Sequence, residues 1–189
     1  MQTIPSADER APGSELLAAV VRILEQGEGL LHLLSDELYT RPLPVAFGAA
    51  IGGHYRHSLD HFRSLLAVAP GGDLDYDRRE RGTAVETNRA AAWRETRELR
   101  AGYEAWLVVW QDRSLAVTCK TSAATADSQT VPSTVSREVM YVVAHAVHHF
   151  ALIRVMAGLM GLNLPPDFGV AASTLQYQAA EAPATAGGG

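Results

Sequence analysis

The sequence has little cysteine and no long uninterrupted hydrophobic run. Its single cysteine, Cys119, cannot form an intramolecular disulfide. No charged-then-apolar leader precedes the first expected helix, so a reducing, cytoplasmic setting fits best. Charged or histidine residues interrupt every expected helix, and no apolar run approaches the roughly 20 residues that cross a bilayer. We therefore expect a soluble protein with no membrane partner.

The sequence also lacks a large excess of charge of one sign. It has 16 basic and 21 acidic residues, interspersed, for a formal net charge of -5. The densest basic run, Arg78, Arg79 and Arg81, is interrupted by Glu80. Nucleic-acid binding usually needs a surface of one sign, and the tryptophans are spaced for core packing rather than for base stacking. We expect no nucleic-acid partner.

The length and composition indicate one folded domain. A chain of 189 residues with 47% hydrophobic content can bury a sizeable core without disulfide or metal staples. Any bound metal would then serve function rather than stability. Small and polar residues dominate both ends, so we expect a flexible arm over residues 1–12, a domain over 13–178 and a disordered tail over 179–189.

Four segments have the apolar spacing and the end signals of long helices. They run from Ser14 to about Leu38, from about Phe47 to Val68, from Thr83 to about Val108, and from Ser133 or Ser136 to Met160. Thr83 and Glu86 have the spacing of a capping box. The apolar stripe of the second segment contains Phe47, Ile51, Phe62 and Leu66. The pattern predicts an all-α four-helix bundle with one long middle connection.

The connections between these helices are of two kinds. From Ser114 to Val131, apolar and polar residues alternate around a polar turn, which predicts a small, marginal β-hairpin. The polar stretch from Asp73 to Gly82 reads instead as an irregular connection.

Six of the seven histidines fall in two clusters: His54, His57 and His61 on the second helix, and His145, His148 and His149 on the fourth. Neutral imidazole is a common ligand for Zn, Ni and similar ions. Histidines four residues apart on a helix, as at His145 and His149, present their rings to one point. Both lie in the apolar stripe, where unbonded ring nitrogens would cost roughly 1 to 3 kcal/mol each. A metal would bond both.

The second helix is less decisive about its ligand. On a helical wheel, His57 lies furthest from the apolar centre, so spacing alone favours His54 or His61 at least as readily. His148 lies beside its stripe and reads as a neighbour of the site or a surface residue. The alternative for both clusters is a set of hydrogen-bonded core histidines, and the isolated His32 is expected to be a core or exposed residue.

Two segments resemble the DinB/YfiT-like superfamily of metal-binding four-helix bundles. They are residues 51–62, IGGHYRHSLDHF, and the run from Arg137-Glu138 to HAVHHFALI at 145–153; residues 167–175 also look like the tail of one DinB-like subgroup. The resemblance covers most of the chain. It implies metal ligands at His57, His145 and His149, with His54, His61 and His148 as their neighbours. It further implies an up-down-down-up bundle, an open coordination position and, as in many members, a homodimer.

The resemblance says less about the reaction, because its members include thiol-dependent transferases, a mycothiol-dependent isomerase and many proteins without an assigned activity. It implies a divalent ion, Zn or Ni first and Mn or Fe second. We expect a thiol S-transferase or hydrolase acting on a small molecule, with a low-molecular-weight thiol as one candidate partner. The rival is a non-catalytic protein that binds a metal or small ligand, and fold analogy does not separate the two.

Other candidate residues could handle protons or hold an anionic substrate. Tyr76 and Arg79, in the connection after the second helix, have suitable side chains, although a solvated loop is the alternative. Asn88 and Glu95 flank the inner stripe of the third helix and are expected at its edge rather than in catalysis. Cys119 has no histidine nearby in sequence, so we expect a packing or surface role for it.

Overall fold

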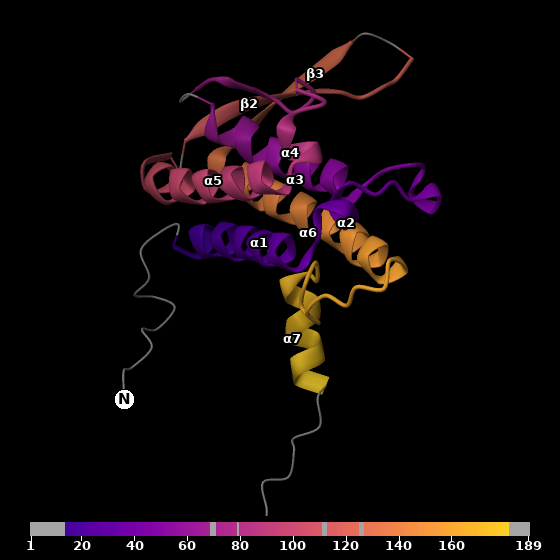
Figure 1. Ribbon diagram of the computed structural model, residues 1–189. Coiled ribbons are helices and arrows are strands. Elements are labelled where there is room, and N and C mark those ends of the chain that lie inside the picture. Colours follow the sequence, from indigo (N-terminus) through magenta and orange to yellow (C-terminus); the bar gives the residue numbers. More distant parts are fainter. Residues whose placement is uncertain (1–13, 69–70, 79, 111–112, 125–126, 182–189) are drawn as a thin grey trace, which may run out of the picture.

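The computed structural model describes residues 14–68, 71–78, 80–110, 113–124 and 127–181. The arm expected over residues 1–12 lies outside them. Four long helices form the body: α1 (Ser14–Leu33), α3 (Ile51–Leu66), α5 (Arg89–Trp110) and α6 (Val135–Leu159). Helices α1 and α3 each pack against both α5 and α6, which closes a four-membered ring (Figure 1). The prediction of an all-α four-helix bundle is confirmed.

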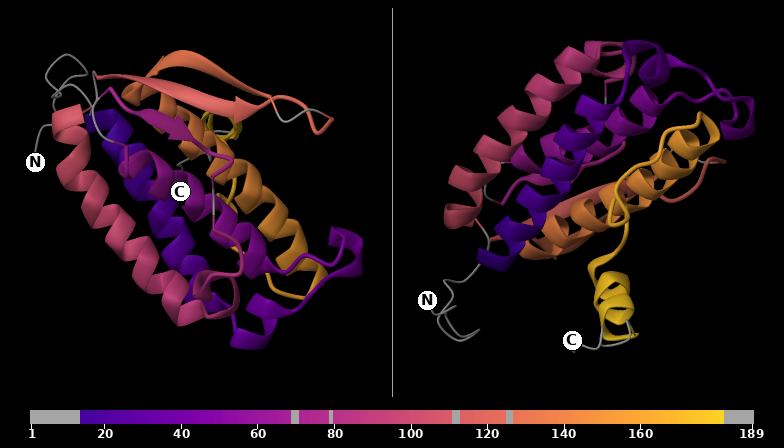
Figure 2. Two further views of the ribbon diagram at one scale, coloured as in Figure 1. Left: turned by 90° about the horizontal axis from the view of Figure 1, so that it is seen from above. Right: turned by 60° about the horizontal axis from the view of Figure 1, so that its bottom comes forward.

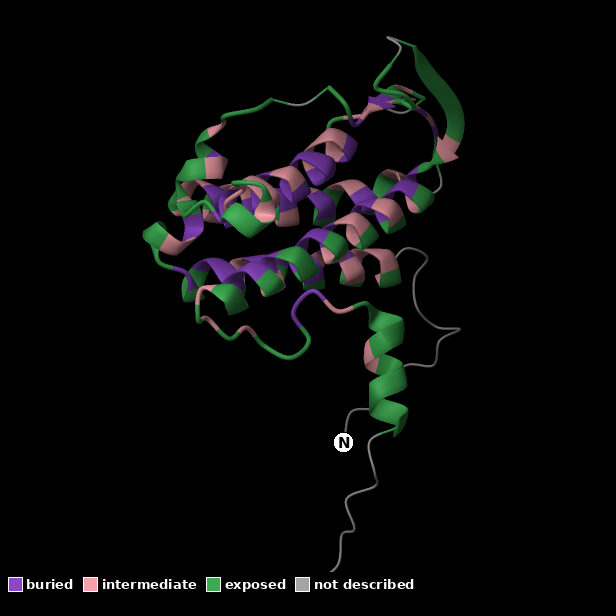
Figure 3. Cartoon of the chain, turned by 90° about the vertical axis from the view of Figure 1, so that its right-hand side faces the viewer, coloured by how far each residue is buried: buried purple, intermediate pink, exposed green. Residues whose placement is uncertain are grey.

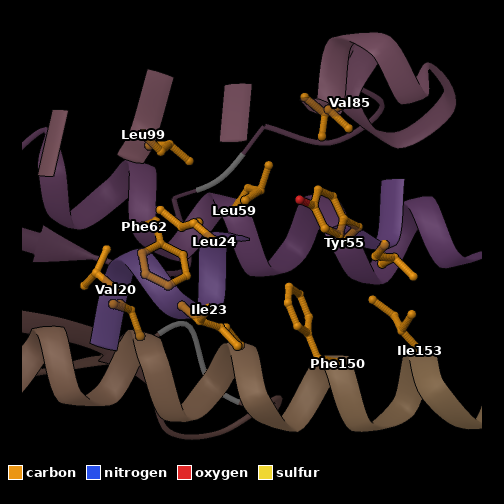
Figure 4. Close-up of a cluster of buried hydrophobic side chains, with 14 of the residues drawn as sticks. Val20, Ile23, Leu24, Tyr55, Leu59, Phe62, Val85, Leu99, Phe150 and Ile153 are labelled. Atoms are coloured by element: carbon orange, nitrogen blue, oxygen red, sulfur yellow. The ribbon is translucent and has the colours of Figure 1, made fainter. Parts of the chain in front are cut away.

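Tyr55 of α3 ties the four helices together at the centre of the core (Figure 4). Its ring stacks on Phe150 of α6 with 5.9 Å between ring centroids, and its hydroxyl lies 2.7 Å from that of Thr96 on α5. On α1, a Cβ atom at Gly27 would lie 2.4 Å from the same hydroxyl, so glycine leaves the room that the ring needs. This packing sets the rotation of α3 about its axis, and with it the direction of the neighbouring histidines.

The first two helices are shorter than predicted. Helix α1 ends at Leu33, and a separate turn, α2 (Asp36–Thr40), starts after Ser35, whose hydroxyl accepts a hydrogen bond from the Leu38 amide at 3.2 Å. Phe47 was wrongly placed in the stripe of the second helix. It follows the 3-10 turn η2 (Pro44–Ala46), has a φ of 55° and is fully exposed, because the prolines direct the chain into a turn before α3 begins.

The third predicted helix is broken at Asn88. A single turn, α4 (Ala84–Thr87), precedes α5, and the Asn88 side chain accepts a hydrogen bond from the Ala91 amide at 2.9 Å. Asn88 is therefore an exposed helix cap rather than a residue at the edge of the inner stripe. The capping box was also wrong: the Thr83 side chain makes no cap hydrogen bond, and Glu86 forms an ion pair with Arg56 of α3 instead.

A small sheet lies over the α3 and α6 side of the bundle (Figures 1 and 2). The predicted hairpin is present as β2 (Ser114–Lys120) paired antiparallel with β3 (Ser128–Thr134). The connection after α3 is not wholly irregular, because β1 (Asp73–Asp75) pairs in parallel with β2 and buries Leu74 beside Val117. The cap of α6 is neither Ser133 nor Ser136 but Thr134, whose hydroxyl accepts from the Arg137 amide at 3.2 Å.

The chain after α6 returns across the bundle and ends in an unpredicted helix, α7 (Ala172–Glu181). Phe168 is buried and stacks on Phe150 with 5.0 Å between ring centroids. Helix α7 then projects away from the body and has no buried residue (Figures 2 and 3). Residues 179–181, expected to be disordered, belong to this helix, and residues 182–189 lie outside the described part of the chain.

Substitution of two adjacent glycines tests the packing of α3 against α4. A Cβ atom at Gly52 would lie 2.1 Å from the Glu86 backbone oxygen and 2.8 Å from the Tyr39 ring, whereas at Gly53 the nearest atom is 3.8 Å away. We predict that Gly52→Ala lowers the free energy of unfolding by about 1 to 3 kcal/mol. Gly53→Ala should leave it unchanged or raise it by up to about 1 kcal/mol. Urea denaturation followed by circular dichroism measures both, and equal effects would contradict this packing.

Candidate metal centre

The contact between α3 and α6 brings the three predicted ligands together. His57, His145 and His149 each offer a ring nitrogen, and these nitrogens all lie within 4.8 Å of one another. The Nε2 atoms of His57 and His145 are 3.2 Å apart, and the ring centroids of His57 and His149 are 4.6 Å apart. His57 is half-buried and faces α6, although the helical wheel had placed it furthest from the apolar centre. Its position agrees with the family resemblance, which gave His57 as the ligand, and not with the helical wheel.

The arrangement fits a divalent ion. With a metal-to-nitrogen distance of about 2.1 Å, two nitrogens lie about 3.4 Å apart on a tetrahedral ion and about 3.0 Å apart at adjacent octahedral positions. The 3.2 Å between the Nε2 atoms of His57 and His145 falls between these values. Imidazole donors suit Zn, Ni and similar ions. Among the described residues this group holds three members and includes neither His54 nor His61.

Burial keeps two of the clustered histidines neutral. Desolvation, reinforced by His145 and His54, lowers the pKa of His149 from 6.5 to about 3. Burial followed by the charge of His148 lowers the pKa of His54 as well. Both imidazoles are therefore uncharged at neutral pH, which is the form that a metal ion binds.

The three other clustered histidines surround the group. His54 Nδ1 lies 3.2 Å from His149 Nδ1, at hydrogen-bond distance. His61 is buried, and its Nδ1 donates to the backbone carbonyl of His57 at 3.0 Å, which leaves the lone pair on Nε2 in the neutral ring. His148 is exposed and touches the edge of His149. Their influence on the metal stays a prediction.

Two residues that were not expected in the site lie away from it. His32 is exposed, with its ring against the edge of Trp93, and Glu95 pairs with Arg63 on α3. Cys119 is a half-buried residue of β2 that lines the cavity of about 510 Å³ described below.

Tyr76 connects the histidines to a buried carboxylate. Its ring stacks on His61 with 4.9 Å between centroids, and its hydroxyl donates to Glu138 Oε2 at 2.9 Å. Glu138 has no exposed surface and also accepts from the Ser133 hydroxyl and from the Arg137 guanidinium, each at 2.6 Å. Three donors therefore satisfy this carboxylate. The other candidate, Arg79, lies outside the described residues.

Sequence reasoning missed Glu138 and Tyr141 as residues near the site. They precede His145 by seven and four positions on α6, and helical spacing of that kind places side chains on one face. The spacing was the available signal, but a search for apolar stripes passes over a glutamate. The Tyr141 ring lies 5.8 Å from that of His145 and 5.2 Å from that of Tyr76.

A cavity of about 510 Å³ opens beside these aromatic residues. Tyr76, Glu138, Tyr141 and Arg137 line it from the bundle side, and β2 and β3 supply apolar walls that include Val117. A larger cavity of about 760 Å³ lies between α3, α5 and the β1 connection, and no histidine lines either cavity. The smaller cavity is therefore the better candidate for a substrate pocket, because Tyr76 and Tyr141 touch both it and the histidines.

Alanine substitutions test the ligand assignment. We predict that His57→Ala, His145→Ala and His149→Ala each remove most of the bound metal, because each deletes one of three donors. His148→Ala is the matched control on α6 and should retain the metal. Elemental analysis of protein purified without a metal-affinity tag measures this. Equal losses at all four positions, or loss only in His54→Ala and His61→Ala, would contradict the assignment.

Comparison with known proteins supports the fold. No family model matches the sequence. YfiT from Bacillus subtilis, described as a probable metal-dependent hydrolase with an unusual four-helix bundle topology, matches the structure with a TM-score of 0.53. The match has 15% sequence identity and covers 86% of this chain and 94% of YfiT.

A second match is to part of a longer protein. FK506-binding protein 5 of Rhizopus delemar is 32% identical over 104 residues, which are 55% of this chain and 27% of the fungal protein. This chain thus spans about a quarter of that protein, and the name describes the whole of it. The likeness to YfiT shows that the chain has the YfiT-like four-helix-bundle fold that its two histidine segments had implied.

Proposed function

We propose that this protein is a metal-dependent enzyme that acts on a small molecule, with its metal held by His57, His145 and His149. The observation that carries the proposal is a group of three imidazoles, rather than four, among the described residues, connected through Tyr76 and Tyr141 to a cavity of substrate size. A catalytic metal keeps a position for water or substrate, whereas a structural zinc site is usually closed by four protein ligands. The description of YfiT as a probable metal-dependent hydrolase agrees with this reading.

The metal would supply Lewis acidity, which makes a water molecule or a thiol a nucleophile near neutral pH. The protein's own residues would hold and orient the substrate. Tyr141 lies between His145 and the cavity, and burial, followed by the charge of Glu138, raises the pKa of its phenol. The phenol therefore stays protonated at neutral pH and can donate a hydrogen bond to a substrate oxygen.

The cavity lining favours a substrate with an apolar part and an anionic group. Val117, Val131 and Pro132 form an apolar wall. Arg137 lies over the Tyr141 ring with its guanidinium carbon 5.5 Å from the ring centroid, and its side chain is 63% exposed although it pairs with Glu138. An exposed guanidinium at the cavity rim can still accept a carboxylate as a further partner.

Hydrolysis and thiol S-transfer both remain within the proposal, because activation of a nucleophile is common to them. Zn or Ni suits three imidazoles best, and Mn or Fe comes second. The candidate from another class is a non-catalytic protein that binds a metal or small ligand in the same place. The open coordination positions and the adjoining cavity favour the enzyme over this alternative.

A paired assay tests the proposed function. The untagged protein is first analysed for metal, then screened with low-molecular-weight thiols and electrophilic acceptors, and in parallel with activated esters and amides. We expect turnover in one arm, its loss on chelation and its return on addition of the ion found by elemental analysis. Stoichiometric metal without turnover in either arm would support the non-catalytic alternative instead.

The Tyr141 hydroxyl gives a more local prediction. Tyr141→Phe keeps the ring contacts with Tyr76 and His145 and removes only the hydroxyl. Loss of a positioned hydrogen-bond donor of this kind should lower kcat/KM by about 10-fold or more for any substrate found in the screen. The metal content of the variant should equal that of the wild type. Unchanged kcat/KM would exclude the proposed role of this hydroxyl.

A further inference from the structure

The planes of the clustered rings distinguish His61 from the three candidate ligands. The ring planes of His57 and His145 are inclined by 80°, those of His57 and His149 by 89°, and those of His145 and His149 by 63°. The lone pair of an imidazole nitrogen lies in the plane of its ring. Rings that are strongly inclined to one another can therefore direct their lone pairs to one point from different sides, as a shared ion requires.

His61 is close to these rings, but it lies flat against one of them. Its centroid is 3.9 Å from that of His145, and the two planes are inclined by only 31°. Coplanar rings cannot approach so closely, so one ring lies over the face of the other. Two rings stacked in this way direct their lone pairs along separate planes and do not converge on one ion. This agrees with the membership of the described metal-binding group, which does not include His61.

Tyr76 covers the other face of His61. The two ring centroids are 4.9 Å apart, and the planes are inclined by 20°. Two rings at such separations from His61 cannot share one of its faces, so Tyr76 and His145 lie on opposite sides of the imidazole. The Nδ1 atom of His61 also donates to the backbone carbonyl of His57 at 3.0 Å. Two stacked rings and one hydrogen bond thus fix the plane of His61.

Glu138 in turn fixes Tyr76. The Tyr76 hydroxyl donates to Glu138 Oε2 at 2.9 Å, and this carboxylate has no exposed surface. Burial, followed by the charge of Glu138, raises the pKa of the Tyr76 phenol, so the phenol keeps the proton that it donates. Hydrogen bonds to a charged acceptor are stronger than those between neutral groups. The carboxylate therefore anchors the phenol ring over His61.

We propose that Glu138 and Tyr76 are positioning residues that keep His61 from becoming a fourth protein ligand. The carboxylate holds the phenol, the phenol covers one face of the imidazole, and the imidazole stays flat against His145. A coordination position that His61 would otherwise take is then left for water or substrate, which a catalytic metal needs. This inference rests on the proposed function, because it assumes the three-histidine metal centre.

Removal of the Tyr76 ring should turn His61 into a ligand. His61 follows His57 by four positions on α3, which is the spacing of His145 and His149 on α6. Side chains four residues apart on a helix are neighbours on one face. Once the space occupied by the phenol is vacated, His61 can rotate away from His145 and direct a nitrogen to the ion that His57 binds. A further donor strengthens metal binding and takes the position of an external ligand.

Cobalt and azide are the probes that test this closure. Metal-free protein is titrated with Co²⁺ and then with azide, and both steps are followed by the visible absorption of the ion. The wild type should bind Co²⁺ and then azide. Tyr76→Ala should bind Co²⁺ at least about 10-fold more tightly and azide at least about 10-fold more weakly. The double variant Tyr76→Ala/His61→Ala should regain both wild-type affinities, because the side chain that closes the shell is gone.

Matched phenylalanine substitutions test the part played by Glu138. Tyr76→Phe and Tyr39→Phe each remove one buried hydroxyl, which donates to Glu138 in the first case and to the Val85 carbonyl at 2.6 Å in the second. Tyr76→Phe should shift both affinities in the same direction as Tyr76→Ala, by about 3-fold, as loss of one hydrogen bond allows. Tyr39→Phe should leave them unchanged. Tyr76→Phe keeps the ring in the core and decides the test if Tyr76→Ala does not fold.

The outcomes separate this inference from the proposed function. If wild-type protein binds Co²⁺ and azide, and Tyr76→Ala binds both with the same affinities, the inference is overturned and the metal centre stands. A double variant that stays as closed as Tyr76→Ala would also overturn it. Equal effects of Tyr76→Phe and Tyr39→Phe would remove the role assigned to Glu138. A wild type that binds no Co²⁺ would contradict the proposed function itself, and the inference with it.

Discussion

The candidate metal centre depends on a row of imidazoles held almost in contact between α3 and α6. His57 and His145 meet at 3.2 Å, and so do His54 and His149. At these distances two charged rings would repel each other, and the burial of His149 lowers its pKa to about 3. A neutral pair at 3.2 Å is satisfied in one of two ways. Either one ring donates its N–H to the other, or both bind one ion.

Binding of one ion accounts better than a hydrogen bond for the grouping of His57, His145 and His149. An N–H donated from His57 to His145 would satisfy those two rings, but it would not explain why a nitrogen of His149 converges on the same point within 4.8 Å. A single ion would bond all three at once. His54, at hydrogen-bond distance from His149, would then hold that ligand in one orientation, as ring neighbours commonly do in metal sites.

Apolar core residues next to the histidines, rather than the histidines themselves, hold these rings in position. On α6, Phe150 and Ala146 are buried next to His149 and His145, so both candidate ligands of this helix are adjacent to a packed apolar residue. On α3, Tyr55 has the same relation to His54 and is fixed by contacts to three other helices. Since the apolar core holds both helices in register, the fold should not require the metal. The metal is then free to serve chemistry at the adjoining cavity.

Most of what sequence could predict here is periodic or local. The 3.6-residue period identified four helices, and the spacing of His145 and His149 marked their shared face. The choice of His57 needed the family resemblance, because a straight helical wheel ignores how Tyr55 rotates α3 against its neighbours. A local pattern also gave a wrong prediction where a contact between distant residues is formed instead. Glu86 pairs with Arg56 rather than completing the predicted capping box.

The features that stayed hidden depend on contacts between distant segments. The buried bond from Tyr76 to Glu138 joins residues 62 positions apart, and neither residue shows in isolation that it will be buried. Strand β1 has three residues and exists only because β2 is there to pair with it. Helix α7 follows a proline-containing loop and has no buried residue. Its sequence therefore lacks the apolar stripe by which a helix is predicted.

The most direct test of metal binding by His57, His145 and His149 is to locate the ion by anomalous diffraction. Crystals of the untagged protein soaked or grown with Zn²⁺ or Ni²⁺ can be measured on both sides of the absorption edge of that metal. The account predicts one anomalous peak per chain, about 2.1 Å from a ring nitrogen of each of His57, His145 and His149. A peak bonded to His54 or His61 in place of His57, or no peak while the imidazoles remain hydrogen-bonded in pairs, would contradict it.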